Sequence, residues 1–275
     1  MRYLVTSSIL SAAISLACVA VGSVTPATAA PAKAMPRLSN GKPDLNGTWD
    51  NGSGIDFIKP VTMPDGSICV SGCMPPPSAE PAAAPPARLP PDRPRYKPQF
   101  VEKVKELEQR QVEMDPVLRC KSPGLPRIGP PDKIVQTLKE IVFLYDDVSG
   151  GFFRIIPLGN QGHRDDVDES YLGDSVGRWE GDTLVIDTVN FNDDSWLTDD
   201  GAFHTTNLRV TETLRRDGDV IEWQAIAEDP QVLAEPWKLR PRRMVLTAVE
   251  LAEAVPCIEQ DLKHVVDGTH HDNPR

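Results

Sequence analysis

The sequence predicts a mainly β protein, an antiparallel β-barrel with one or two helices on its outside. Short segments rich in Val, Ile, Phe and Tyr follow one another after Cys120, and most are joined by short turns. The alternation of strands and helices that is typical of a nucleotide-binding α/β fold is not found. With 275 residues, 40% of them hydrophobic, the chain can bury the core of one such barrel.

About eight strands are expected, which suits an antiparallel sheet closed on itself. Asp217-Gly218 lies between two alternating segments and is the strongest hairpin signal in the chain. Glu180-Gly181-Asp182 indicates a second turn. The predicted strands are residues 45–49, 133–138, 140–146, 151–157, 183–189, 207–216, 219–228 and 237–248.

Residues 1–29 are interpreted as a secretory signal peptide, since Arg2 precedes an apolar stretch and Ala27-Thr28-Ala29 fits a cleavage site. A membrane anchor and a lipoprotein modified at Cys18 are the alternatives. Residues 30–275 are then a single barrel domain, which we expect to be periplasmic or secreted. No transmembrane segment is expected in this mature chain.

Three parts of the domain are expected to lie outside the barrel. Residues 74–98 are rich in proline and alanine, which favours an extended surface segment. Residues 97–115 predict a peripheral helix, with one apolar side made by Phe100, Val104, Leu107 and Met114. Residues 259–275 are a polar tail, which holds three of the five histidines.

Cysteine usage predicts disulfides. Five cysteines are present, and loss of Cys18 with the signal peptide leaves an even number in an oxidising compartment. Three pairings are possible, of which we favour Cys69–Cys73 and Cys120–Cys257. A zinc site is the alternative, but Cys-x3-Cys without a neighbouring ligand is weak evidence for one.

The net charge of the chain limits the classes of partner that it can bind. The formal net charge of −11 argues against nucleic acid or an anionic membrane surface. A small-molecule ligand or substrate is the partner that remains. The sequence makes no prediction of the oligomeric state.

Three motifs stand out in the sequence: Asp44-Leu45-Asn46-Gly47-Thr48-Trp49, the KIVQT of residues 133–137 and the GRWEGDTLVIDT of residues 177–188. They resemble those of a large family of exported bacterial proteins whose biochemical role is largely unassigned. The similarity covers nearly all of the mature chain, apart from the proline-rich segment. Gly47-Thr48-Trp49 also resembles the G-x-W of lipocalins, which implies a lipocalin-like or calycin-like barrel with the tryptophan at one end.

One carboxylate stands at an unusual position in a predicted strand. Alternation in residues 207–216 places Leu208, Val210, Glu212 and Leu214 on one face, which is apolar apart from the carboxylate. Burying a carboxylate is unfavourable unless a partner or a proton compensates its charge. Glu212 therefore indicates a site inside the barrel.

The residues around Glu212 suggest acid–base chemistry on a small, partly apolar or aromatic compound. His204 precedes its strand, and His163 follows the strand that contains Arg154. If the histidines and Glu212 face one opening, they form an acid–base set, assisted by Arg154 and suited to a lyase, isomerase or hydrolase. No cofactor is expected, with a divalent metal on the same three residues as the alternative.

Two other interpretations of these residues are open. Arg154 and Glu212 could form a structural ion pair inside the barrel. The pocket could also belong to a non-catalytic, lipocalin-like binding protein of the cell envelope. No serine or cysteine has an adjacent base that would make it a nucleophile. The residues expected to line a ligand pocket are Trp179, Trp196, Trp223 and Asp187.

Overall fold

The structure is a computed structural model that describes residues 35–52, 61–62, 68–69, 92–147, 149–159, 161–253 and 257. Four predictions therefore lie outside the described residues. They are the signal peptide at 1–29, the Cys69–Cys73 disulfide, most of the proline-rich segment at 74–98 and the polar tail at 259–275. In the part of the chain that is described, no helix combines the length and the apolar character needed to cross a membrane.

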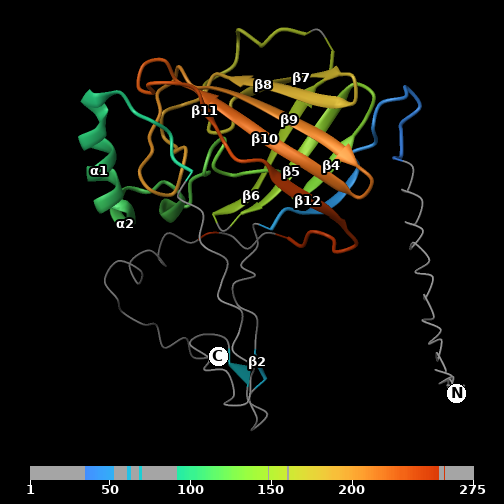
Figure 1. The fold of residues 1–275 in the computed structure, drawn as a ribbon, viewed down its shortest axis with the longest axis horizontal. Coiled ribbons are helices and arrows are strands. Elements are labelled where there is room, and N and C mark those ends of the chain that lie inside the picture. Colours follow the sequence, from blue (N-terminus) through green and yellow to red (C-terminus); the bar gives the residue numbers. More distant parts are fainter. Residues whose placement is uncertain are drawn as a thin grey trace, which may run out of the picture. The chain divides into compact units, whose positions relative to one another are not determined.

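The protein is built on an antiparallel sheet that curls into a nearly closed barrel, as the sequence predicts (Figure 1). Nine strands follow one another around it in the order β6-β5-β4-β1-β12-β10-β9-β8-β7, and β11 pairs with β10 beside this path. A separate ladder joins β2 (Val61–Thr62) and β3 (Ile68–Cys69). The strands of the barrel sheet are β1 (Gly47–Asp50), β4 (Lys133–Gln136), β5 (Glu140–Asp147), β6 (Gly150–Pro157), β7 (Asp174–Glu180), β8 (Thr183–Val189), β9 (Arg209–Asp217), β10 (Val220–Glu228), β11 (Trp237–Lys238) and β12 (Arg242–Thr247).

The barrel is incompletely closed between the two ends of this path, β6 and β7. Neighbouring strands on the path are antiparallel, so with nine strands the two end strands run in the same direction. Among the described residues, their backbone pairing consists of one parallel bridge between Leu158 and Gly177, where Gly159 N–H donates to the Gly177 carbonyl at 3.1 Å. We call this junction of β6 and β7 the seam.

Two strand predictions differ from the structure. β7 is not among the predicted strands, because Asp174, Ser175 and Gly177 are poor strand formers, and the strand is held by its full ladder with β8. The single strand predicted at 237–248 is two strands, β11 and β12. Pro241 lies between them and has no N–H to give to a ladder, so the strand is interrupted there.

The peripheral helix forms where it is predicted, in three short pieces: η1 (Pro98–Phe100), α1 (Val101–Gln109) and α2 (Gln111–Met114). A further turn, η2, spans Val117–Arg119. The predicted apolar side packs against the core, which accounts for its spacing. At the contact, Gly201 has φ +82°, and a Cβ there would lie 2.7 Å from the Glu108 backbone nitrogen.

Inward-facing side chains of the strands fill the barrel. Trp49, the tryptophan of G-x-W, is buried, donates from Nε1 to the Leu45 carbonyl at 3.0 Å, and has the Arg216 guanidinium 5.0 Å from its ring centroid. The apolar core continues across the facing strands, where fully buried side chains include Ile134, Ile141, Phe143, Ile156, Leu184, Ile186, Leu214 and Trp223. This core surrounds a small group of polar side chains next to the seam.

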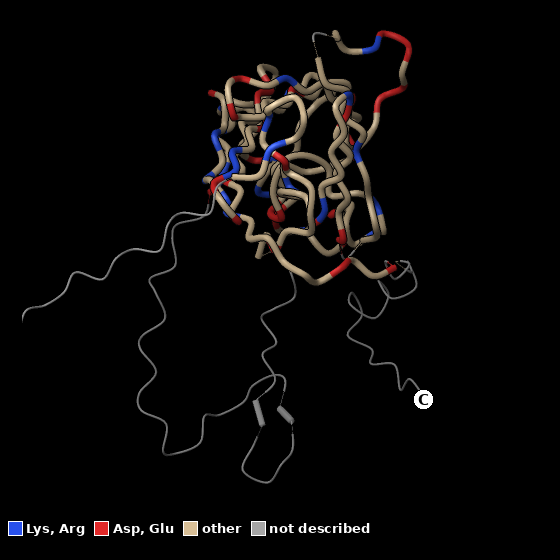
Figure 2. The backbone as a smooth tube through the Cα atoms, turned by 90° about the vertical axis from the view of Figure 1, so that its right-hand side faces the viewer, with Lys and Arg blue, Asp and Glu red and all other residues tan. Residues whose placement is uncertain are grey.

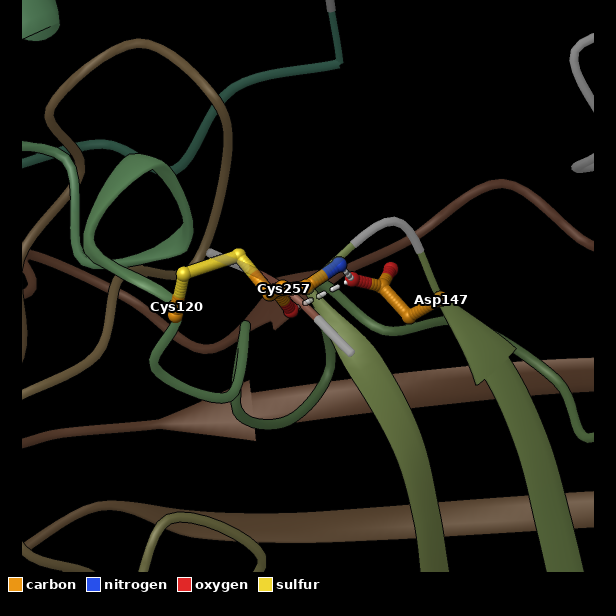
Figure 3. The surroundings of a disulfide bond; sticks show 4 residues. Cys120, Asp147 and Cys257 are labelled. Carbon is orange, nitrogen blue, oxygen red and sulfur yellow. Dashed lines mark hydrogen bonds between the residues drawn. A yellow bond between two sulfur atoms is a disulfide. The ribbon is translucent and has the colours of Figure 1, made fainter. Parts of the chain in front are cut away.

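A disulfide joins Cys120 to Cys257, with the Cα atoms 5.4 Å apart, which confirms this predicted pair (Figure 3). It ties the segment after the helix to the end of the barrel chain across 137 residues of sequence. In its surroundings, Asp147 at the end of β5 accepts hydrogen bonds from the backbone and hydroxyl of Ser149 at 2.9 and 2.6 Å.

Candidate functional site

Arg154 on β6 and Glu212 on β9 form an ion pair inside the barrel. Arg154 Nη2 lies 2.7 Å from Glu212 Oε2, and the Glu212 side chain is completely buried. The other carboxylate oxygen, Oε1, accepts a hydrogen bond from Trp223 Nε1 at 3.0 Å. The contact at Oε2 is electrostatic, without the directionality of a hydrogen bond. The structural pairing that the sequence left open is therefore present.

Hydroxyl groups complete the surroundings of the guanidinium. Arg154 Nη1 donates to the Tyr145 hydroxyl at 3.0 Å, and Nη2 donates to Ser175 Oγ and Thr188 Oγ1 at 2.9 and 3.1 Å. Ser175 Oγ and Thr188 Oγ1 are themselves 3.0 Å apart. Because Ser175 lies on β7, Arg154 links β6 to β7 across the seam, where backbone pairing is sparse. The seam is thus closed from inside by side chains.

The surroundings of the Arg154 guanidinium determine its charge and that of the Tyr145 hydroxyl. Burial by itself lowers the pKa of Arg154, but the Glu212 carboxylate and the Tyr145 oxygen outweigh it, and the net pKa is raised. Burial also raises the pKa of Tyr145, so its hydroxyl keeps its proton. The guanidinium is therefore charged at every physiological pH.

A pocket of about 770 Å³ lies along β6 at the seam. Its walls come from both faces of β6, from the segment before β7 and from the residues that follow Cys120. Phe153 and Ile155 are exposed on the outer face, at 64% and 53%. The lining residues are Cys120, Lys121, Ser122, Phe152, Phe153, Arg154, Ile155, Pro157, Arg164, Ser170, Tyr171, Leu172, Gly173 and Ser175.

His163 lies between two carboxylates, beside this pocket. Its Nδ1 is 3.2 Å from Asp174 Oδ2, and its Nε2 is 3.0 Å from Asp187 Oδ2. Both carboxylates can only accept hydrogen bonds, so either ring nitrogen contacts its carboxylate as a donor when it carries a hydrogen. The arrangement ties the segment before β7 to the edge of the sheet.

Two arginines extend this chain of charges. Arg164 Nε donates to Asp174 at 2.7 Å, and Arg209 contacts Asp187 through two nitrogens at 2.6 and 2.7 Å. Burial raises the pKa of each carboxyl, but the hydrogen bonds from Arg164 to Asp174 and from Arg209 to Asp187, together with those from His163, outweigh it. The pKa of both carboxyls is therefore held below its usual value. Asp187, predicted to face a ligand, is occupied by these partners.

His204 occupies a different environment, in which both ring nitrogens have neutral partners. Nδ1 is 3.0 Å from the Thr205 carbonyl, which can only accept, so Ser195 Oγ donates to Nε2 at 2.8 Å. Burial lowers the pKa of His204, and the ring is neutral. Sequence reasoning missed Ser195 because its proximity to His204 depends on the bridge between Trp196 and Phe203.

The Ser195–His204 pair has the geometry of a nucleophile beside its base. Ser195 is fully buried and His204 is 2% exposed, however, and neither lines the pocket along β6. The four residues predicted to form an acid–base set are thus distributed over three environments. Arg154 and Glu212 are together, His163 is beside Asp174 and Asp187, and His204 is beside Ser195.

The predicted ligand-lining tryptophans also lie apart. Trp223 and Trp196 belong to the core, while Trp179 is partly buried, and its indole nitrogen has no hydrogen-bond partner among the described residues. Trp179 lines a separate pocket of about 280 Å³ with Leu158 and Arg178. Among the described residues, no group of three His, Cys, Asp or Glu side chains is arranged to hold a metal ion.

The fold and site define a nearly closed antiparallel barrel with a buried Arg–Glu pair and an apolar pocket at its seam. Comparison of the chain with models of known protein families, with curated proteins and with solved structures found no match.

Proposed function

We propose that the protein binds a small, partly apolar molecule in the pocket along β6. The observation on which this rests is the composition of the pocket: aromatic and aliphatic walls, a few hydroxyls and a fixed, buried cation. Pockets of several hundred cubic ångströms with apolar walls and a few placed polar groups are typical of small-molecule sites.

A neutral fluorescent probe tests this proposal. N-phenyl-1-naphthylamine should bind the purified protein with saturable, one-to-one stoichiometry. Ile155→Asp places a charge on the pocket wall and should weaken binding by about 10-fold or more, the effect of about 1.4 kcal/mol. Val245→Asp is the matched control, because Val245 on β12 is 49% exposed and does not line the pocket. Equal weakening by both variants would contradict the assignment.

Acid–base catalysis on the same ligand is a second candidate function. It is favoured by His163, which is oriented by Asp174 and precedes Arg164 of the pocket lining. Once a ligand is recovered from native protein and identified, its conversion should be lost in His163→Gln with binding retained. If neither the parent nor the His163→Gln protein converts the ligand, binding without catalysis is the function that remains.

The cellular location belongs to the same proposal. The predicted signal peptide and the resemblance to exported bacterial proteins suggest that the pocket works in the periplasm or outside the cell. Sequencing the N-terminus of protein recovered from the periplasm should show a chain that begins at Ala30. An unprocessed chain beginning at Met1 in the cytosol would contradict it.

A further inference from the structure

We infer that the ligand of the seam pocket is an anionic amphiphile, with one acidic head group, such as a carboxylate, on an apolar body. This inference rests on the proposed binding function and specifies its ligand. It follows from the charges on the pocket lining and from two features of the described residues: the Arg154 Nε has no hydrogen-bond partner among them, and the seam edge of β6 is sparsely paired.

The charge of the pocket differs from that of the whole protein. The chain has a formal net charge of −11, yet the lining contains three cations and no carboxylate among the described residues. The cations are Lys121, Arg154 and Arg164. Figure 2 shows that both signs of charge are spread over the rest of the barrel.

Each cation is held in place by a carboxylate that is not part of the lining. Lys121 Nζ lies 3.4 Å from Asp194, and Arg164 Nη2 lies 2.7 Å from Asp174. Arg154 is held by Glu212 inside the barrel. The ion pairs fix the positions of the cations while leaving their remaining N–H groups for a ligand. An acidic head group can accept hydrogen bonds from these N–H groups.

Arg154 has a donor that the barrel does not use. Its Nε is buried and has no hydrogen-bond partner in the part of the chain that the structure describes, although Nη1 and Nη2 are bonded. A buried N–H without a partner is costly in free energy. Because Arg154 lines the pocket, we expect an oxygen of the ligand to accept a hydrogen bond from this Nε–H group.

The edge of β6 provides backbone donors as well. The Leu158 N–H donates to the Lys139 carbonyl on the β5 side, at 2.7 Å, so alternate residues of β6 face β5. The backbone N–H groups of Phe153 and Ile155 therefore point away from β5, into the seam. Neither has an acceptor among the described residues. These N–H groups lie beside the cations of the lining, an arrangement that suits an anionic head group. The carbonyl groups of the same two residues point the same way, so the cations are what favours an anion over a cation.

The apolar part of the ligand is matched by the walls. Phe152, Ile155, Pro157 and Leu172 line the same pocket, and its volume of about 770 Å³ exceeds what a small inorganic anion needs. A charged head with an apolar body would satisfy both kinds of lining at once. A free inorganic anion would leave the apolar walls unused.

A series that varies the head group on one apolar chain tests this inference. Decanoate, decanamide and decylammonium should be compared as displacers of N-phenyl-1-naphthylamine from the purified protein. Decanoate should displace the probe at a concentration about 10-fold or more below decanamide, with decylammonium the weakest, because charge-assisted hydrogen bonds favour the acid.

Substitution of the two exposed cations of the pocket lining tests whether they cause the preference for the acid over the amide. Lys121→Gln with Arg164→Gln should weaken decanoate about 10-fold and leave decanamide unchanged. The side chains of Lys121 and Arg164 are 43% and 64% exposed, so neither substitution removes a side chain from the core. Arg178→Gln is the control, since Arg178 is also exposed and paired with a carboxylate but lines a different pocket.

The outcomes separate this inference from the proposed function. Equal displacement by acid and amide would overturn the anionic ligand while leaving a pocket that binds apolar molecules. A probe that does not bind the parent protein at all would overturn both. Co-sedimentation with phosphatidylglycerol vesicles, without displacement of the probe by decanoate, would assign the cations to a membrane surface and also overturn the inference.

Discussion

Arg154 and Glu212 lie 2.7 Å apart in the barrel interior, on strands that are not neighbours in the sheet. Arg154 also reaches Ser175 on β7, so one side chain both neutralises the buried carboxylate and bridges the seam. The pair thus connects the inward carboxylate, which the alternation of the sequence predicts, with the closure of the barrel, which it does not predict.

Glu212→Gln should lower the free energy of unfolding by about 3–5 kcal/mol, because it leaves the Arg154 charge buried and unpaired. Denaturant unfolding measures this directly. The double variant Arg154→Met, Glu212→Leu is the control, since removing both charges together should recover most of the loss. A Glu212→Gln protein as stable as the parent would show that the pair does not stabilise the barrel.

Loss of the disulfide should destabilise the protein. Replacing Cys120 and Cys257 by serine opens a loop of 137 residues, which typically costs about 2–5 kcal/mol through the entropy of the unfolded chain. Thermal unfolding of the variant should match that of the reduced parent. An unchanged midpoint, or free thiols at these positions in the oxidised protein, would rule out the bond.

Stability should fall in acid through His204. Burial lowers its pKa in the folded state, so below about pH 6.5 the unfolded chain binds a proton that the folded protein does not. The contribution of His204 is therefore complete above that pH and decreases as the pH falls. Between pH 7.5 and 5.5 the parent should lose more stability than His204→Gln, with an upper limit of about 1.4 kcal/mol for each pH unit below 6.5. Parallel pH profiles for the two proteins would refute this.

Gly201→Ala should destabilise the contact between the peripheral helix and the barrel. The new Cβ would lie 2.7 Å from the Glu108 nitrogen, and overpacking of this kind costs about 1–3 kcal/mol. Gly52→Ala is the control, because Gly52 also has positive φ but, apart from its chain neighbours, no atom of the described residues lies within 4 Å of its Cβ position. The difference between the two variants in urea unfolding isolates the steric part, and equal values would place the whole effect in the backbone.

Most of the architecture follows from local patterns in the sequence. Alternating apolar residues located most strands, and the apolar spacing of Phe100, Val104 and Leu107 located the peripheral helix. The inward direction of Glu212 followed from the same two-residue period, because that period is a local property of an extended backbone. The pairing of Cys120 with Cys257 was selected among few possibilities.

Which side chains meet depends on long-range packing, which local patterns do not encode. β7 has weak local signals and forms through its ladder with β8, and as the ninth strand it produces the seam and its pocket. The two histidines show the same limit: His163 binds Asp174 and Asp187, while His204 binds Ser195. Such contacts depend on register, on the number of strands and on loop paths. Register, strand number and loop paths are set by the free energy of the whole packed chain, so the residue pattern of a single segment does not predict them.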